Sequence, residues 1–111
     1  MTEARIKAGI WVSMALRMGN ADGRYGTVIR KGDADAGSVL VVLRNDKDVS
    51  VLSQMRSADG VLTWLRATGT GPVDDATADA YIARQLKFDP DLWVIEFEAT
   101  DLLPPFEAKL V

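Results

Sequence analysis

Residues 38–44 (SVLVVLR) constrain the fold of this chain more than any other stretch, because they are apolar on both of their alternating faces. Successive side chains of a β-strand point to opposite faces of the sheet. Here Val39, Val41 and Leu43 alternate with Leu40 and Val42. A strand that is apolar on both faces is typical of the middle of a sheet that is covered on both sides. The sequence therefore predicts a central strand with a packing layer above it and another below.

Three further strands are predicted around this one, joined by short connections. Residues 25–30 precede it across the loop GDADAG at residues 32–37, so the two strands are interpreted as a β-hairpin. Residues 49–56 and 61–66 follow it, and turn residues separate them: Ser57, Ala58, Asp59 and Gly60. Strands with short connections usually pair with their neighbours in sequence. We therefore expect an antiparallel meander of four strands.

Two helices and a fifth strand complete the predicted fold. The first helix covers residues 4–20. The second covers residues 75–87, with Asp74 as its N-cap and Pro90 closing it. Residues 92–99 form the last strand. The prediction is an α+β domain in the order α-β-β-β-β-α-β, with a mainly antiparallel five-stranded sheet and both helices packed on it.

The first predicted helix is more apolar than a single contact requires. Its residues also alternate like a strand, but apolar residues recur every four positions from Ile6 to Met18. The polar sector consists only of Gly9, Ser13, Arg17 and Asn20. A helix on one sheet needs an apolar stripe of about 100°, so we expect the surplus to meet the C-terminal tail or a second copy of the chain. The residues predicted to form a homodimer interface are Ile10, Trp11, Met14 and Met18.

The length and composition indicate one domain, residues 1–111. The chain has 111 residues, of which 48% are hydrophobic, and a chain of this size buries roughly two-thirds of its unfolded surface. No internal repeat or low-complexity tract divides it. Residues 100–111 (TDLLPPFEAKLV) surround Pro104 and Pro105 and are expected to form an extended tail that docks on apolar surface.

The chain contains no cysteine and no histidine. A disulfide framework, a thiolate-ligated metal, a Ser-His-Asp triad and a histidine-ligated zinc site are therefore excluded. We expect no cofactor, no metal and a cytoplasmic location. Arg17 interrupts the apolar stretch near the N-terminus, which argues against a signal peptide. No apolar run approaches the ~20 residues needed to cross a bilayer, so no membrane association is expected.

The charge distribution disfavours nucleic-acid binding. The net charge is −3, with six basic and two acidic residues in residues 1–31 and seven basic and fourteen acidic residues in residues 32–111. The basic residues are interleaved with apolar positions and do not form a block. An acidic chain of this kind is poorly suited to follow a phosphate backbone.

Two charged clusters are candidate binding sites. The first consists of Arg30, Lys31, Asp33 and Asp35, and the second consists of Arg84, Asp89 and Asp91, near Trp93. Either cluster could bind an anionic or zwitterionic partner, and intrachain ion pairs explain both equally well. Asp33 and Asp35 also match the opening of a calcium-binding loop, but the position that needs a bidentate glutamate holds Arg44. Turns in which aspartate side chains accept backbone N–H groups are the favoured interpretation.

The residues also resemble a known family. The stretches VIRKGDADAGSVLV and DAYIARQLKFDPDLWVIE, together with RIK, WV and LR near the N-terminus, are similar to a bacterial domain-of-unknown-function family over residues 5–98. The GDADAG and FDPDLWVIE stretches look like its signatures. The family has no established activity, so the resemblance implies no catalytic residues.

Three functional hypotheses remain open. The first is a small non-enzymatic interaction module that forms a homodimer. The second is a small-molecule-binding protein or minor enzyme that uses the charged loop of residues 30–35, with Asp or Lys as its acid–base groups. The third is a weak nucleic-acid binder.

Overall fold

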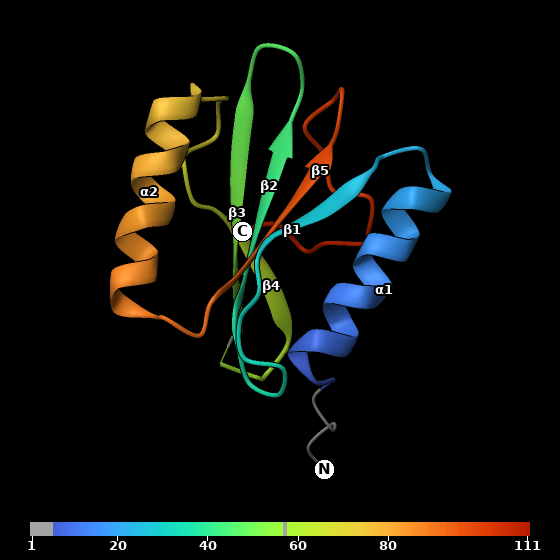
Figure 1. The fold of residues 1–111 in the computed structure, drawn as a ribbon, viewed down its shortest axis with the longest axis vertical. Helices are drawn as coiled ribbons and strands as arrows, with labels where there is room; N and C mark the ends of the chain where they lie inside the picture. The colour runs from blue at the N-terminus through green and yellow to red at the C-terminus, as the bar shows by residue number, and fades with distance from the viewer. Residues whose placement is uncertain (1–5, 57) are drawn as a thin grey trace.

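The computed structural model describes residues 6–56 and 58–111, and within them the chain forms two helices and five strands in the predicted order (Figure 1). Their bounds are α1 Ala8–Ala21, β1 Gly26–Arg30, β2 Val39–Arg44, β3 Val49–Arg56, β4 Leu62–Arg66, α2 Asp75–Phe88 and β5 Trp93–Glu98. The α+β class is confirmed. The predicted helix start at Ala4 and the predicted turn residue Ser57 lie outside the described residues.

The sheet is mixed, and its strand order differs from the predicted meander. The order is β1-β5-β2-β3-β4, with β5 antiparallel to β1 and parallel to β2. The pairs β2–β3 and β3–β4 are antiparallel, as a meander requires. The predicted hairpin of β1 and β2 is wrong, because β5 lies between these two strands.

Burial explains why β5 and not β1 lies beside β2. Four of the five residues of β1 are exposed, whereas four of the six residues of β5 are buried. The first five residues of β2 are all buried, so the strand next to β2 must itself be covered on both faces. The weakly apolar β1 therefore takes the edge of the sheet, and the last strand of the chain inserts between β1 and β2.

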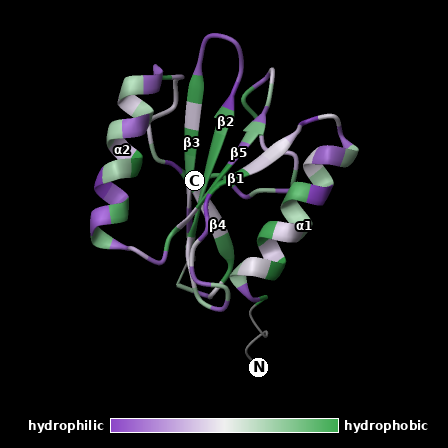
Figure 2. Ribbon diagram, in the orientation of Figure 1, coloured by the Kyte–Doolittle hydropathy of each residue, from purple (hydrophilic) through white to green (hydrophobic). Residues whose placement is uncertain are grey.

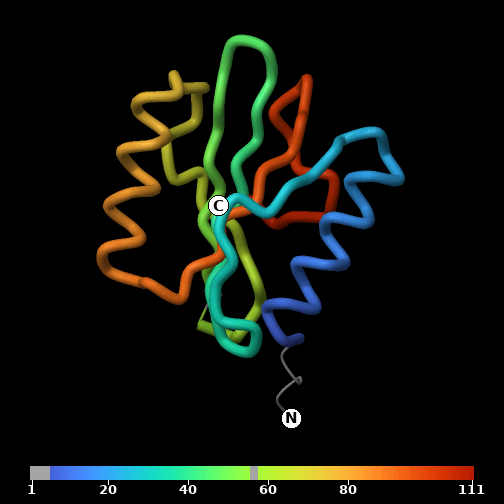
Figure 3. The backbone as a smooth tube through the Cα atoms, viewed as in Figure 1, coloured from blue at the N-terminus to red at the C-terminus, as the bar shows by residue number. Residues whose placement is uncertain are grey.

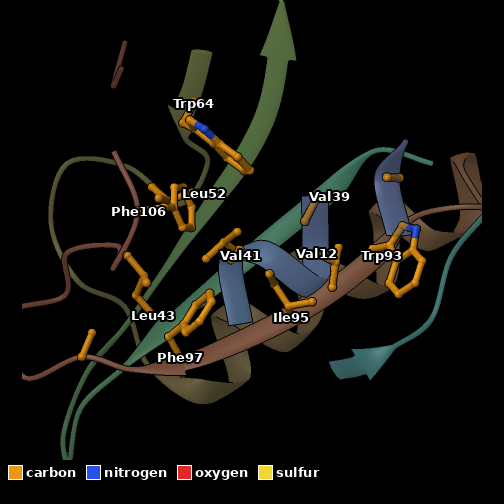
Figure 4. Packing of buried hydrophobic residues seen from close by; sticks show 13 residues of the cluster. Val12, Val39, Val41, Leu43, Leu52, Trp64, Trp93, Ile95, Phe97 and Phe106 are labelled. Atoms are coloured by element: carbon orange, nitrogen blue, oxygen red, sulfur yellow. The ribbon is translucent and has the colours of Figure 1, made fainter. Parts of the chain in front are cut away.

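The helices cover opposite faces of the sheet (Figure 1). On the α1 face, Val12 and Ala15 pack with side chains of β2 and β5 that include Val41, Ile95 and Phe97 (Figure 4). On the α2 face, Ala78 packs with Leu40, Val42, Val51 and Val94. The hydropathy colouring shows the apolar central strands between two helices of mixed character (Figure 2). The prediction that β2 is covered on both sides is confirmed.

An aromatic cluster joins the C-terminal tail to the α1 face. Trp11, Trp64 and Phe106 lie with ring centroids 5.1 to 5.3 Å apart, and Phe97 lies 6.3 Å from Phe106. Phe106 is buried with the core of this face. The backbone N–H of Trp64 also donates to the carbonyl of Lys109 at 2.8 Å. The tail therefore closes the core and also covers the outer edge of β4.

Candidate functional site

The loop between β1 and β2, which holds most of the first charged cluster, closes the N-terminal end of α1 (Figure 3). The N-cap residue, Lys7, makes no side-chain cap hydrogen bond. The N–H groups of Gly9 and Ala8 instead donate to the carbonyls of Ala34 and Asp35, at 2.9 and 3.3 Å. The first N–H groups of a helix have no partner within the helix. The loop therefore supplies the acceptors that α1 lacks.

Asp33 holds this loop together with its side chain and its backbone. One carboxylate oxygen accepts the N–H groups of Asp35 and Ala36, at 3.2 and 2.8 Å. The N–H of Asp33 donates to the carbonyl of Asp91, and its own carbonyl accepts the indole N–H of Trp93 at 2.8 Å. The turn interpretation of Asp33 agrees with these contacts.

The two signature stretches of the family resemblance meet at this loop. A Cβ atom on Gly32 would lie 2.2 Å from the carbonyl oxygen of Asp91, and one on Gly37 would lie 2.6 Å from the same oxygen. Both would also come within 3 Å of the Trp93 ring. Glycine at these two positions therefore lets the loop lie directly against the start of β5.

The second charged cluster is partly joined to the first. The guanidinium of Arg30 donates to the carbonyl of Pro90 at 3.2 Å, and a carboxylate oxygen of Asp89 accepts the N–H of Asp91 at 3.1 Å. Lys31 and Arg84 are exposed, and Arg84 lies on α2. The contacts described above thus bring together Arg30, Asp33, Asp35, Asp89 and Trp93, and they involve neither Lys31 nor Arg84. These polar groups support the loop, and a ligand site there stays a prediction.

The residues predicted for a dimer interface divide between the two sides of α1. Trp11 is half-buried and packs against Trp64 and Phe106. Ile10, Met14 and Met18 remain 55%, 45% and 46% exposed. Ile6, just before the helix, is 52% exposed and continues the same four-residue spacing. We call Ile6, Ile10, Met14 and Met18 the outer stripe of α1.

A groove lies between α2 and the β1 side of the sheet. Its volume is about 310 Å³, and its lining residues are Ile29, Val42, Arg44, Asp79, Ile82, Ala83, Leu86, Val94 and Glu96. None of the predicted binding residues belongs to this lining. Sequence reasoning missed the groove because it placed β1 beside β2. The sequence signal for the groove was Arg44 at the end of the apolar strand β2 and Glu96 within the largely apolar strand β5, which also contains Glu98.

Arg44 connects α2 to the sheet beside the groove through two ion pairs. Its Nε donates to Glu96 at 3.0 Å, and its guanidinium also pairs with Asp75 in the first turn of α2. These two partners raise the pKa of Arg44, with the hydrogen bond to Asp75 contributing most. Arg44 is therefore engaged by two carboxylates from two different elements.

A second hollow, with a polar lining, lies at the end of the sheet where β2 and β5 finish. Its lining includes Arg24, Arg44, Asp46, Glu98 and Asp101. Arg24 donates to both carboxylate oxygens of Asp101, at 2.6 and 3.0 Å. Within residues 6–56 and 58–111, no group of three or more acidic side chains is placed to hold a metal ion.

The Arg24–Asp101 pair predicts an acid-dependent loss of stability. The side-chain hydrogen bonds from Arg24 contribute most to lowering the pKa of Asp101 from 3.8 to about 2, and the backbone N–H of Leu103 contributes next. A carboxyl group whose pKa is lower in the folded state stabilises the fold above its unfolded pKa, and this contribution is lost as the pH falls through the folded value. We expect the difference in unfolding free energy between the wild type and Asp101→Asn to shrink as the pH falls from 4 to 2, which chemical denaturation at each pH measures.

Arg24→Gln provides the control for this prediction. In that background the largest cause of the lowered Asp101 pKa is gone, while the N–H of Leu103 still donates to the carboxylate, so the effect of Asp101→Asn is expected to change less between pH 4 and pH 2 than it does with Arg24 present. A pH dependence as large without Arg24 as with it would contradict the assignment.

Comparison with known proteins identifies relatives of the chain. A family model described as "Protein of unknown function (DUF1491)" matches residues 6–107. A crystal structure of a DUF1491 family protein from Caulobacter crescentus CB15 has a TM-score of 0.84 and 31% identity, and the match covers 96% of this chain and 100% of that one. An NMR structure of a DUF1491 family protein from the same organism has a TM-score of 0.84 and 30% identity, with 98% and 99% coverage.

A more distant solution structure, of a protein from A. tumefaciens, shares the fold. Its TM-score is 0.75 at 23% identity, and the match covers 96% of this chain and 98% of that one. No curated protein matches the chain in sequence. In the part of the chain that the structure describes, neither helix has the length and apolar character required of a membrane span. The family model covers most of the chain and agrees with the resemblance seen in the sequence, so the chain belongs to the DUF1491 family of proteins of unknown function.

Proposed function

We propose that this chain is a non-enzymatic interaction module that forms a homodimer through the outer stripe of α1. The observation that supports it is the exposure of three large apolar side chains on one side of α1 and of Ile6 just before the helix, each about half exposed. Contiguous apolar surface of this kind, flanked by polar residues, is typical of protein interfaces.

The spacing of the outer stripe suits helix–helix packing. Residues four apart form a ridge on a helix surface, and ridges of this class pack into the matching grooves of a second helix at a crossing angle of about −50°. In the neighbouring row of α1 the small residue Ser13 is exposed, between Gly9, which lies against the loop of residues 32–37, and Arg17. The shallow surface at Ser13, beside the ridge formed by Ile10 and Met14, would let two copies of α1 pack symmetrically.

The edges of the sheet are less suited to pairing two copies. The tail covers β4 through the hydrogen bonds of Trp64 with Lys109 and Val111. The β1 edge has a register shift between Val28 and Arg30. Bulges and cations are features that protect edge strands from pairing. The proposal therefore assigns the contact to α1. We also propose a cytoplasmic location, supported by the absence of cysteine.

Met14→Lys tests the proposed dimer. A lysine in the middle of the outer stripe would place a charge in an apolar contact, so we expect the dimer dissociation constant to rise by roughly tenfold or more. Size-exclusion chromatography with light scattering across a concentration series measures this change. The fold of the monomer should be unchanged, because Met14 is 45% exposed.

Met55→Lys is the matched control. Met55 lies on β3 and is 41% exposed, so the same substitution is made at similar exposure on a different surface. We expect it to leave the dimer intact. A wild type that stays monomeric up to roughly 1 mM, or equal effects of the two variants, would overturn the proposal.

A further inference from the structure

We propose that the groove between α2 and the β1 side of the sheet binds a small organic cation that has an apolar body and a terminal ammonium group. The groove exists because α2 packs over β3, whereas β1 lies at the edge of the sheet and is separated from β3 by β5 and β2. Ala78 is the only buried residue of α2. Ile82 and Leu86, one and two turns further along, are only partly buried and form one wall of the groove.

The apolar body of the ligand is matched by the floor and wall. Val42 and Val94 form the floor and are nearly fully buried, and Ile29 from β1 lies opposite the α2 wall. Ile29 is 57% exposed, so a ligand that covers it removes apolar surface from water. A volume of about 310 Å³ lies at the lower end of the range for small-molecule sites, and such sites combine apolar linings with a few placed polar groups.

The charge of the ligand follows from the polar groups at the groove. The lining contains one cation, Arg44, and two anions, Asp79 and Glu96. Arg44 is already paired with Glu96 and with Asp75. Among the described residues, Asp79 makes no ion pair, and the ion pair of Glu96 with Arg44 uses one oxygen, Oε1. Arg44 carries one positive charge, and Asp75, Asp79 and Glu96 carry three negative charges, so the net charge of these four side chains is −2. This charge complements a cationic ligand and opposes a carboxylate ligand.

The test compares three probes that share a six-carbon body: hexylamine, 1-hexanol and hexanoate. Each is titrated into the full chain at low salt, and binding is followed by the backbone amide shifts in two-dimensional NMR spectra. We expect hexylamine to bind with a dissociation constant at least about tenfold lower than that of hexanoate, because the net negative charge of the side chains at the groove favours a cation. Its largest shifts should lie at Ile29, Ile82, Leu86 and Val94, and binding should weaken as salt is raised.

Substitutions on α2 separate the apolar contribution from the charge contribution. Ala83→Trp fills the groove and is expected to raise the dissociation constants of hexylamine and 1-hexanol alike by at least about tenfold. Ala80→Trp, at an exposed α2 position outside the lining, should leave both dissociation constants unchanged. Asp79→Asn preserves the shape of the side chain and should weaken the binding of hexylamine alone. Because Asp79 is exposed, this substitution should not disturb the fold, and it serves as a second variant if Ala83→Trp perturbs the helix.

Three results would overturn the proposal. The first is hexanoate binding as tightly as hexylamine. The second is a set of shifts that lies outside the groove or is insensitive to Ala83→Trp. The third is a concentration-dependent self-association that Ala83→Trp abolishes and Met14→Lys does not, which would make a second copy of the chain the occupant. The proposed α1 dimer is tested separately by Met14→Lys. If no dimer forms, the prediction that the groove binds an organic cation is unaffected.

Discussion

Replacing Phe106 with alanine is expected to lower the free energy of unfolding by about 3–5 kcal/mol. Phe106 is 9% exposed and contacts the rings of Trp11, Trp64 and Phe97. Its loss would remove the apolar burial and leave a cavity that these rings cannot fill without moving. Because folded domains are stable by only about 5–15 kcal/mol, this single change should bring the protein close to unfolding at room temperature. Urea denaturation measures the effect.

A second readout distinguishes release of the tail from global unfolding. The tail is the element that carries Phe106, so its release would expose Trp64, which is 1% exposed in the intact fold. We expect the tryptophan emission of Phe106→Ala to shift to longer wavelength even without denaturant. Phe88→Ala is the control, since Phe88 is 85% exposed and its loss should change stability by no more than about 0.5 kcal/mol. Similar losses in the two variants would contradict the packing of the tail.

Gly32→Ala is expected to lower the free energy of unfolding by up to about 3 kcal/mol, although it adds only one methyl group. The added Cβ would lie 2.2 Å from the carbonyl oxygen of Asp91 and 2.7 Å from the carbonyl carbon of Leu92. Both atoms belong to the backbone, so no side-chain rotation relieves the clash. The loop would have to move away from β5, which lengthens the hydrogen bond from Asp33 to Asp91 and the one from Trp93 to Asp33. Thermal and urea unfolding both measure the loss.

Gly71→Ala provides the matched control for this prediction. A Cβ at position 71 meets nothing within 4 Å, and the backbone there does not have a positive φ. The added methyl group restricts the unfolded chain, so the substitution should be neutral or stabilise the protein by about 0.4–1 kcal/mol. A Gly32→Ala variant as stable as Gly71→Ala would show that the loop does not lie against β5 as described.

Local sequence patterns predicted the elements of the fold well. Asp74 was predicted to cap the second helix, and its carboxylate accepts the N–H of Thr77 at 2.8 Å. The helix runs Asp75–Phe88, one residue beyond the predicted end. These features depend on side chains and backbone groups only a few positions apart, so a short window of sequence contains them.

The candidate surfaces were predicted less completely. The apolar excess of the first helix indicated an exposed stripe, and Ile10, Met14 and Met18 are exposed. Trp11 lies on the same helix and turns inward, because Trp64 and Phe106 offer aromatic partners there. The groove could not be predicted at all, since its lining combines β1, β2, β5 and α2 in an arrangement that depends on the strand order.

The amino-acid sequence by itself determined that residues 38–44 form a central strand covered on both sides, because apolar residues on both faces of a strand must be buried on both faces. Only the tertiary structure decided which strand lies next to it. β1 and β5 can each form hydrogen bonds with the backbone of β2, and backbone hydrogen bonds carry no information about side-chain identity. The choice follows from burial: β5 has apolar side chains for both packing layers, whereas β1 does not, and this difference places β1 at the edge and leaves the groove beside it.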